Sequence, residues 1–437
     1  MKTAIRLFVI AFIFIITISL SACKNQREQS LEEMYNIKNC SVVYFENNST
    51  EFYNFGNGTD EKTVYELASN GKPIAAYIAL EMVNEGILDI NEKIAPYLGS
   101  DLLTDDIRLN EITLYQLLCH TAGFSPNYEL GTDKKIYSDP GSMFCYSGVG
   151  YIYLQNVIEN ASGMTIEQAA EHYVFKPLGM ENSTFESVTT ITPYMNFSSA
   201  LLYALAFFIL SFIVLLIIAY IAGKLTKFKY YSFINIFPVC FLAAGIINAI
   251  FLLFFFVSKV LLIFLICFAV MGAALFLTKK YTKLFYACIP IITSALFIFS
   301  FISSVNIPVT NDLIAKAPNC AYTFKSTSED MAIFCEELVR KAKGSDDIFK
   351  NMFAPAVEID ENNAWGLGIA IETISGSETT YWHSGINPGF QSLFVLYPEE
   401  NKYIVILTNS DSGLDFSKEM ARSFLSIDGE WNIKRIF

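Results

Sequence analysis

Alternating apolar and polar positions mark the first elements that the chain predicts after residue 40. Residues 41–45 and 51–55 alternate in this way, and the polar residues 47–49 lie between them, which together predict a β-hairpin. A third alternating run, residues 63–68, is followed by a helix-like apolar run at residues 74–83. This helix is expected to end near Gly86, because Asn84-Glu85-Gly86 is typical of a helix end.

Two other stretches are continuously apolar, and the first is the N-terminus. A positively charged start precedes an apolar run over residues 7–20, and Cys23 follows two small residues. This order is typical of a secretory signal peptide over residues 1–22, and its end resembles the bacterial lipobox, in which the cysteine is lipidated. We therefore expect a lipid on Cys23 and a tether over residues 23–38. The alternative is an uncleaved anchor helix, and either interpretation places the following residues outside the cytoplasm.

The second apolar stretch, residues 196–307, predicts four transmembrane helices. They are expected at residues 197–222, 232–256, 260–278 and 284–306. Each is close to the ~20 residues that a bilayer core requires, and none contains Asp, Glu, Lys, Arg or His. Three lysines follow the first crossing and three follow the third, so the positive-inside rule places both of these loops in the cytoplasm and both ends of the block outside. If the second and third crossings were a single span, the two flanks would lie on opposite faces of the membrane.

Composition agrees with a membrane protein and argues against several kinds of partner. The chain has 437 residues, of which 53% are apolar, and its mean hydropathy is +0.39. A net charge of −13 on an exported chain argues against a nucleic-acid partner. The nine cysteines show no CxxC spacing, so no disulfide pairing follows from the sequence. The three histidines do not lie at ligand spacing from one another, which argues against a metal site.

The stretch Ser69-Asn70-Gly71-Lys72, directly before the predicted helix, carries the first candidate chemistry. At three residues' spacing on a helix, the Ser69 hydroxyl and the Lys72 amine share one face. The amine can then take the serine proton or lower the pKa of the hydroxyl, as a serine nucleophile requires. N–H groups at a helix N-terminus favour a developing oxyanion at the same place. Ser-x-x-Lys also occurs by chance in many proteins, so the chemistry depends on further motifs.

Further motifs follow in order along the chain. They are residues 112–124, 146–151, 162–165, 177–180, 326–331, 365–368 and 383–390. Together with Ser69 and Lys72 they resemble the serine beta-lactamase and penicillin-binding-protein superfamily, and most of all its branch of class C beta-lactamases, D-Ala-D-Ala peptidases and related esterases. The resemblance covers residues 40–187 and 317–425.

This resemblance implies an α+β fold of the beta-lactamase type, in which helices flank an antiparallel sheet beside an all-helical part. Residues 39–195 and 308–437 would form this domain, and the four transmembrane helices would be an insertion into it. If Ser69 and His383 line one cleft, the number of crossings between them must be even. Four crossings meet that condition.

The resemblance also implies a role for each motif residue. Ser69 would be the nucleophile that forms an acyl-enzyme, and Lys72 would lower its pKa or relay its proton. Tyr146 would be the general base or the partner of that base. His383 would line the opposite wall and hydrogen-bond to the substrate or to Tyr146. None of these roles requires a cofactor.

Backbone groups and glycines would complete the site. The N–H groups of Ser69 and Ile386 would form the oxyanion hole, and Gly385 would keep that strand open to the substrate. Gly148 departs from the family pattern, because an asparagine usually stands there and its amide contacts the lysine and the substrate. Losing one positioned donor costs about 10²–10³-fold in rate. Gly148 therefore argues against efficient beta-lactamase or peptidase activity and leaves esterase-like chemistry or slow acylation open.

Each of these side chains, taken singly, also has a structural interpretation as a solvated lysine, a half-buried tyrosine or a strand histidine. Only their order along the chain favours the site. We expect structural roles for the other two histidines. His120 should hydrogen-bond within a turn, and His172 should lie on a helix surface. Cys145 is expected to be a small core residue, with a reactive thiol near the cleft as the alternative.

The leading hypothesis is a membrane-bound serine hydrolase of the cell envelope that acts on D-amino-acyl peptides, esters or related acyl compounds, including peptidoglycan fragments. The second is a catalytically degenerate domain that binds cell-wall fragments or beta-lactams and is coupled to the four helices. The sequence does not identify a membrane protein partner. A transporter is disfavoured because the crossings contain no charged residue or histidine. A hydrolase of the G-x-S-x-G type is disfavoured because no candidate serine has that surrounding sequence.

Overall fold

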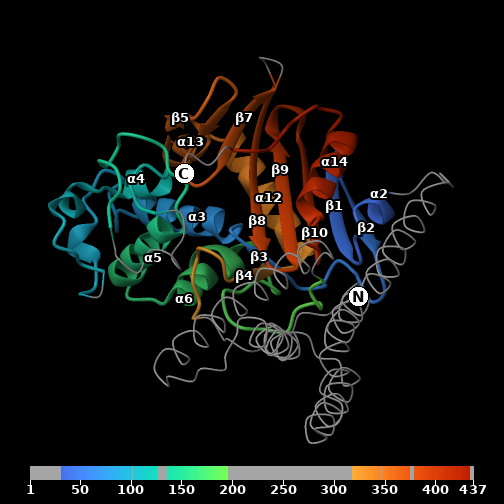
Figure 1. The fold of residues 1–437 in the computed structure, drawn as a ribbon, viewed down its shortest axis with the longest axis horizontal. Helices are drawn as coiled ribbons and strands as arrows, with labels where there is room; N and C mark the ends of the chain where they lie inside the picture. Colours follow the sequence, from blue (N-terminus) through green and yellow to red (C-terminus); the bar gives the residue numbers. More distant parts are fainter. Residues whose placement is uncertain are drawn as a thin grey trace, which may run out of the picture.

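An eight-stranded sheet lies beside a helical part in the structure of the chain (Figure 1). The computed structural model describes residues 31–100, 102–125, 135–194, 317–345, 347–374 and 378–433. The predicted signal peptide, Cys23 and all four predicted transmembrane helices lie outside these residues. In the part of the chain that is described, no helix combines the length and the apolar character needed to span a bilayer.

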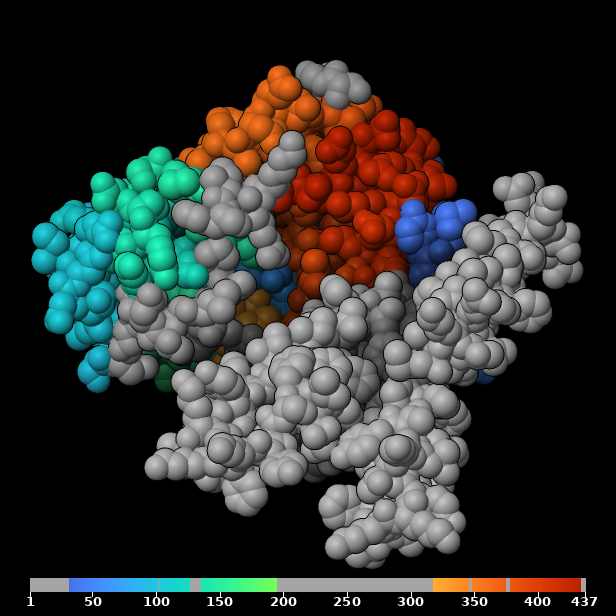
Figure 2. All heavy atoms as spheres, viewed as in Figure 1, coloured from blue at the N-terminus to red at the C-terminus, as the bar shows by residue number. Residues whose placement is uncertain are grey.

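The sheet is antiparallel throughout and brings together the two ends of the described chain. Its strand order is β2-β1-β10-β9-β8-β7-β6-β5. The strands are β1 (Cys40–Glu46), β2 (Ser49–Phe55), β5 (Val357–Glu358), β6 (Asn363–Trp365), β7 (Ala370–Ile374), β8 (Glu378–Asn387), β9 (Phe390–Tyr397) and β10 (Lys402–Thr408). The predicted hairpin is confirmed as β1 and β2, and β1 pairs on its other side with β10. In Figure 2, blue atoms from the start of the described chain adjoin red atoms from its end.

Two helices cover the faces of this sheet. They are α12 (Ser328–Lys343) and α14 (Gly413–Leu425), and both pack against β9 and β10. Every residue of β10 after Lys402 is buried, so both faces of that strand are covered. In Figure 1, α14 lies in front of the sheet and α12 lies behind it. Removal of these apolar layers from water is the main force that holds the sheet between the two helices.

The helical part is arranged around α3 (Gly71–Asn84). Nearly all residues of α3 are buried, which shows that neighbours surround it on every side. It packs against α5 (Gly148–Ser162), α6 (Ile166–Ala170) and α13 (Asp347–Phe353), and the shorter helices of this part are α4 (Leu114–Leu118) and α7 (Lys176–Leu178). The predicted helix at residues 74–83 is confirmed. It begins three residues earlier than expected, so Lys72 lies in its first turn.

A two-stranded sheet joins the parts of the chain that lie on either side of residues 195–316. Strand β3 (Tyr65–Ala68) pairs with β4 (Phe324–Ser326), and β3 also packs against β8. The β1–β10 pairing joins the same two parts a second time. The two parts therefore form one fold. The expected α+β class, with an antiparallel sheet and helices around it, is confirmed.

Residues 31–38, which are the last eight of the expected tether, pack against the folded domain. Residues Leu31–Met34 form the short helix α2, and the Tyr35 ring lies 6.3 Å from the ring of Phe416. Ile37 is buried. Residues 31–38 therefore belong to the folded domain, because their apolar side chains pack against its core.

Asn409, directly after β10, is fully buried and connects three segments of the chain. Its Oδ1 accepts the N–H of Asn39 at 3.0 Å, and its Nδ2 donates to Asn39 Oδ1 at 3.1 Å and to Thr192 O at 2.7 Å. We expect Asn409→Ala to lower the free energy of unfolding by about 2–4 kcal/mol, because it leaves buried polar groups without partners. Unfolding in denaturant measures this change.

The matched control for Asn409 is Asn160, an exposed residue whose amide donates to Tyr97 O at 2.7 Å. Asn160→Ala should change the free energy of unfolding by about 0.5 kcal/mol at most, because water replaces the lost hydrogen bond. Equal losses in the two variants would show that burial of Asn409 has no special importance.

Candidate active site

Ser69 lies between β3 and α3, where the chain turns from strand to helix. The preceding Ala68 has a φ of 48°, in the left-handed region that residues other than glycine rarely occupy. Such a conformation persists only where the surrounding structure holds it in place. The next residue, Asn70, is buried and donates from Nδ2 to Ser392 Oγ at 2.8 Å. The turn therefore holds Ser69, which is half-buried, at the start of α3.

Lys72 is almost completely buried, with only 1% of its surface exposed. Its Nζ donates to Ser69 Oγ at 2.9 Å and to Ala321 O at 2.7 Å. The same Nζ lies 5.1 Å from the ring centroid of Tyr146 and 5.6 Å from that of Tyr151. The alternative of a solvated lysine is therefore wrong. An amine in this position stabilises negative charge on Ser69 Oγ.

Tyr146 comes from the segment directly before α5 and is half-buried. Its ring centroid lies 6.1 Å from that of His383 and 5.6 Å from that of Trp365. The structure thus brings together side chains from β3–α3, from the segment before α5 and from β8. These are the four residues predicted to be catalytic, Ser69, Lys72, Tyr146 and His383.

His383, on β8, is 2% exposed. Its Nδ1 lies 2.9 Å from Ser384 O, which requires the proton on Nδ1 and leaves a lone pair on Nε2. Burial, and then the charge of Lys72, lower the pKa of His383 from 6.5 to about 3, so the ring is neutral at physiological pH. Nε2 has no hydrogen-bond partner among the described residues. Of the two partners expected for His383, Tyr146 is therefore not bonded to it.

Close packing against β3 explains why residue 385 is a glycine. A Cβ there would collide with the carbonyl oxygen of Leu67, so only glycine lets β8 approach β3 this closely. That Gly385 also keeps the strand open to the substrate stays a prediction. The next residue, Ile386, has a side chain that is 49% exposed. Because β7 pairs with β8 only as far as Trp382, the end of β8 has no strand partner on that side within the described chain.

Gly148 is the first residue of α5, and Ser147 caps that helix by accepting the N–H of Gly150 at 2.9 Å. The φ of Gly148 is not in the left-handed region. The backbone therefore does not require glycine at this position.

Sequence reasoning missed Ala321, whose carbonyl accepts a hydrogen bond from Lys72. It lies in a turn held by Asn319, whose Oδ1 accepts the N–H groups of Ala321 at 3.1 Å and Tyr322 at 3.0 Å. Gln155 of α5 binds the same turn by accepting the N–H of Cys320 at 3.2 Å. A main-chain carbonyl has no signature in the sequence. Only Asn319, a residue type that often forms such turns, could have indicated it.

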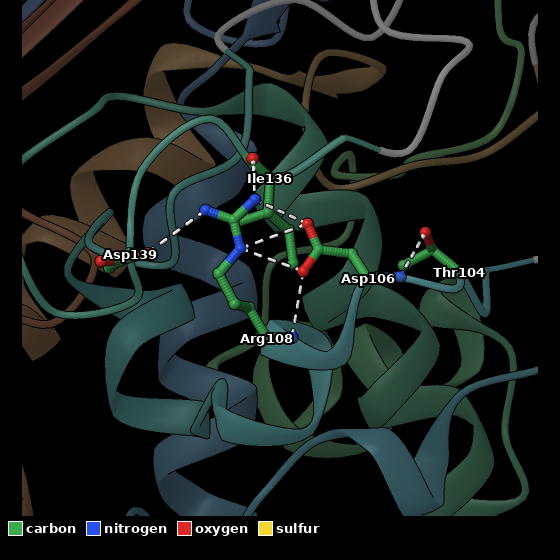
Figure 3. Close-up of polar contacts among 5 residues, drawn as sticks. All are labelled: Thr104, Asp106, Arg108, Ile136 and Asp139. Atoms are coloured by element: carbon green, nitrogen blue, oxygen red, sulfur yellow. Dashed lines mark hydrogen bonds and ion pairs between the residues drawn. The ribbon is translucent and has the colours of Figure 1, made fainter.

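Arg108 holds the loop that leads to Tyr146. Figure 3 shows its guanidinium between Asp106, at 2.6 Å, and this loop, where it donates to Ile136 O at 2.7 Å and contacts Asp139 at 3.3 Å. The hydrogen bonds from Arg108 lower the pKa of Asp106, so this pair stays ionised. The loop is thereby fastened to the segment that precedes α4.

The remaining candidates have structural positions. His120 Nδ1 accepts the N–H of Ser147 at 3.0 Å, 27 residues further along the chain, so this bond is not the expected one within a turn. His172 is exposed as expected. Cys145 is buried and donates to Phe124 O at 3.2 Å, and burial raises its pKa to about 11. It is therefore a core residue and not a reactive thiol. The five cysteines that the structure describes are all free, and no cluster of metal-ligating residues occurs in the described ranges.

Comparisons with known proteins agree with this arrangement. A family model described as Beta-lactamase matches residues 25–194 and 307–426. The chain is similar to the "Putative D-alanyl-D-alanine carboxypeptidase" of Salmonella typhimurium and to the protein of the same name in Salmonella heidelberg, each 31% identical over 147 residues. The matched region is 28% of this chain and 34% of each relative, so it spans about a third of the length of these curated proteins.

Solved structures resemble the chain over most of its length. They include a penicillin binding protein from Bacillus halodurans, with a TM-score of 0.58, 14% identity and coverage of 90% of this chain and 97% of the other. A beta-lactamase/D-alanine carboxypeptidase from Pseudomonas syringae has a TM-score of 0.56, 14% identity and coverage of 91% and 95%. At these identities the similarity shows the fold alone.

The neutral state of His383 predicts how stability depends on pH. Its pKa is about 3 in the folded protein and 6.5 when unperturbed, so only the unfolded chain binds a proton between these values. The free energy of unfolding should therefore fall as pH decreases below 6.5, by about 1 kcal/mol per pH unit for this residue. His383→Gln should reduce the slope between pH 6.5 and 5, and unfolding in denaturant at several pH values measures it.

His172→Gln is the matched control for this measurement, because His172 is exposed. This variant should keep the wild-type dependence on pH. An identical slope in wild type and His383→Gln would contradict a buried, neutral His383.

Proposed function

The chain belongs to the beta-lactamase family, and from this membership we propose that it is a serine hydrolase that forms an acyl-enzyme on Ser69. The observation that carries the proposal is the hydrogen bond of 2.9 Å between Ser69 Oγ and the buried Nζ of Lys72. A buried amine beside a half-exposed hydroxyl stabilises the alkoxide that attacks a carbonyl. A solvated pair would have a much smaller effect, because water screens the charge.

In the proposed reaction, Ser69 Oγ attacks the carbonyl carbon of an ester or amide, and the Oγ proton passes to the Tyr146 oxygen, which would act as a phenolate beside the Lys72 ammonium. The tetrahedral intermediate expels an alcohol or amine, which takes that proton. Water then attacks the acyl-enzyme in the same way and releases the acid and free Ser69. The N–H groups of Ser69 and Ile386 would hold the oxyanion. His383, whose Nε2 is buried, would line the site beside Tyr146.

Small acyl compounds, including D-amino-acyl peptides, their esters and peptidoglycan fragments, are the proposed substrates. Support comes from the names of the Salmonella relatives and of the structural neighbours, which refer to D-alanine carboxypeptidases and penicillin binding. Gly148 favours esters within this class. Peptides and beta-lactams depend more on the side-chain amide that this position lacks.

The proposal also places the domain on the outer face of the cell membrane, with a lipid on Cys23 and four crossings within residues 196–307. The N-terminal pattern and the lysines between the crossings support it. One contact adds to this support. Ala321, which follows the apolar block, accepts a hydrogen bond from Lys72, which precedes it. Both flanks must then lie on one side of the membrane, and an even number of crossings meets that requirement.

A second candidate function is a degenerate domain that binds cell-wall fragments or beta-lactams without turnover and is coupled to the predicted helices and to a membrane protein partner. Gly148 favours it, because slow acyl transfer converts a hydrolase into a binding protein. The Ser69–Lys72 hydrogen bond favours the hydrolase.

Covalent labelling of the full-length protein in membranes tests the acyl-enzyme. We expect a fluorophosphonate to label the wild type and Ser69→Ala to abolish the label, because the Ser69 hydroxyl forms the bond. A fluorescent penicillin used in parallel distinguishes penicillin-binding from esterase-like chemistry. Equal labelling of wild type and Ser69→Ala would contradict the nucleophile. A folded wild type that neither probe labels would favour the degenerate domain.

Restoring the asparagine should accelerate acylation by amides and beta-lactams. We expect Gly148→Asn to raise the second-order rate constant for a fluorescent penicillin about tenfold or more, because one positioned donor contributes about 10²–10³ in rate. The rate with a simple ester should change less. Time-resolved fluorescence of the labelled protein measures both rates.

Gly163→Asn, at the other end of the same helix, is the matched control for Gly148→Asn. Asparagine tolerates its left-handed φ of 72°, and the position is remote from Ser69 in the chain. This variant should react like the wild type. A folded Gly148→Asn with an unchanged rate would show that position 148 does not contact the substrate.

A further inference from the structure

His120 makes hydrogen bonds to the backbone on both sides of Tyr146. Its carbonyl oxygen accepts the N–H of Cys145 at 2.8 Å, and its Nδ1 accepts the N–H of Ser147 at 3.0 Å. Only Tyr146 lies between these two donors. A single residue therefore holds the peptide unit that follows Tyr146, and it also holds the Phe144–Cys145 unit on the other side.

The conformation of His120 makes this double contact available. Its φ is 57°, in the left-handed region where residues other than glycine are uncommon, although asparagine, aspartate and histidine are enriched there. A backbone in this region persists only where the surrounding structure holds it. Here it directs the carbonyl and the imidazole of one residue to the same segment of chain.

The imidazole also packs against the tyrosine ring itself. The centroids of His120 and Tyr146 lie 4.5 Å apart, with 38° between the ring planes. The Trp365 ring lies 5.0 Å from His120 and 5.6 Å from Tyr146, and His120 is 2% exposed. Tyr146 is therefore held by ring packing as well as through its backbone. In this position its ring centroid lies 5.1 Å from Lys72 Nζ.

His120 can accept the N–H of Ser147 only as a neutral ring with its proton on Nε2. Burial is the main cause that lowers its pKa well below 6.5, and the charge of Lys72 lowers it further. The ring is therefore neutral at physiological pH. The contact with Ser147 persists across the range in which the enzyme would work.

We propose that His120 is a positioning residue for Tyr146, which directs the phenol toward Ser69 and Lys72. This inference rests on the proposed function, because it gives Tyr146 a part in proton transfer. A misplacement of about 1 Å in a reacting group can cost about 10²-fold in rate. Loss of the bonds around Tyr146 should therefore change the kinetics of acylation as well as the stability of the fold.

Two substitutions at position 120 distinguish the effect of losing the Nδ1 acceptor from the effect of changing the left-handed backbone conformation. Asparagine and glycine both tolerate a left-handed φ, but only the Oδ1 of asparagine can replace Nδ1. We expect His120→Gly to lower the rate constant for phosphonylation of Ser69 at saturating fluorophosphonate about tenfold or more, and His120→Asn to stay within about threefold of the wild type. The apparent dissociation constant of the probe should change little, because the acceptor acts through Tyr146.

Cys119→Ala is the matched control, because Cys119 is the buried neighbour of His120 on the same segment. With the melting temperature measured for every variant, it should lose stability without losing phosphonylation rate. A folded His120→Gly that reacts as fast as the wild type would overturn the proposal. A His120→Asn as slow as His120→Gly would overturn it as well, because the acceptor would then have no effect.

A second readout does not depend on turnover. In the full-length protein labelled with [¹³Cζ]tyrosine, the Tyr146 resonance is the one that Tyr146→Phe removes. We expect its chemical shift to move in His120→Gly and to return toward the wild-type value in His120→Asn. An unmoved resonance overturns the positioning role. The resonance can move in His120→Gly and return in His120→Asn even if no probe labels the protein. That outcome would support the positioning role, and it would count only against the proposed hydrolase activity.

Discussion

Burial of the Lys72 amine is the constraint on which the rest of the structure depends. An amine taken out of water destabilises the fold unless its N–H groups find acceptors. The acceptors here are Ser69 Oγ and Ala321 O, which come from parts of the chain on either side of residues 195–316. The site therefore exists only when both parts have folded together. The β1–β10 and β3–β4 pairings hold them in that relation.

The same arrangement explains how one domain accommodates a long insertion. Contacts within the domain fix both flanks, since Tyr194 donates its N–H to Asn409 O at 2.9 Å and Cys320 donates its N–H to Gln155. The distance between Ser69 and Ala321 is set by these contacts and not by the residues inserted between them.

Lys72 also affects the protonation of the rings around it. Its charge adds to the effect of burial on His120 and His383, and both rings stay neutral. Each neutral ring then has a nitrogen lone pair, which His120 uses for the Ser147 N–H and which His383 presents at Nε2. One cation among neutral rings acts in surroundings of low polarity. There, its field on the serine oxygen is stronger than it would be in water.

The sequence by itself determined the hairpin and the central helix, and its resemblance to a known family implied the α+β class and the four catalytic candidates. Alternation, helical periodicity and the Ser-x-x-Lys spacing act between neighbours in the chain, so they are visible without the fold. Only the tertiary structure decided that Lys72 is buried and that its amine donates a hydrogen bond to the carbonyl of Ala321. It also decided that Gly385 packs against Leu67 and that His120 bonds to the backbone on both sides of Tyr146. These contacts join segments that are far apart in the chain, and several of them use main-chain atoms, which every residue type carries. Burial likewise depends on what the rest of the chain packs against a side chain.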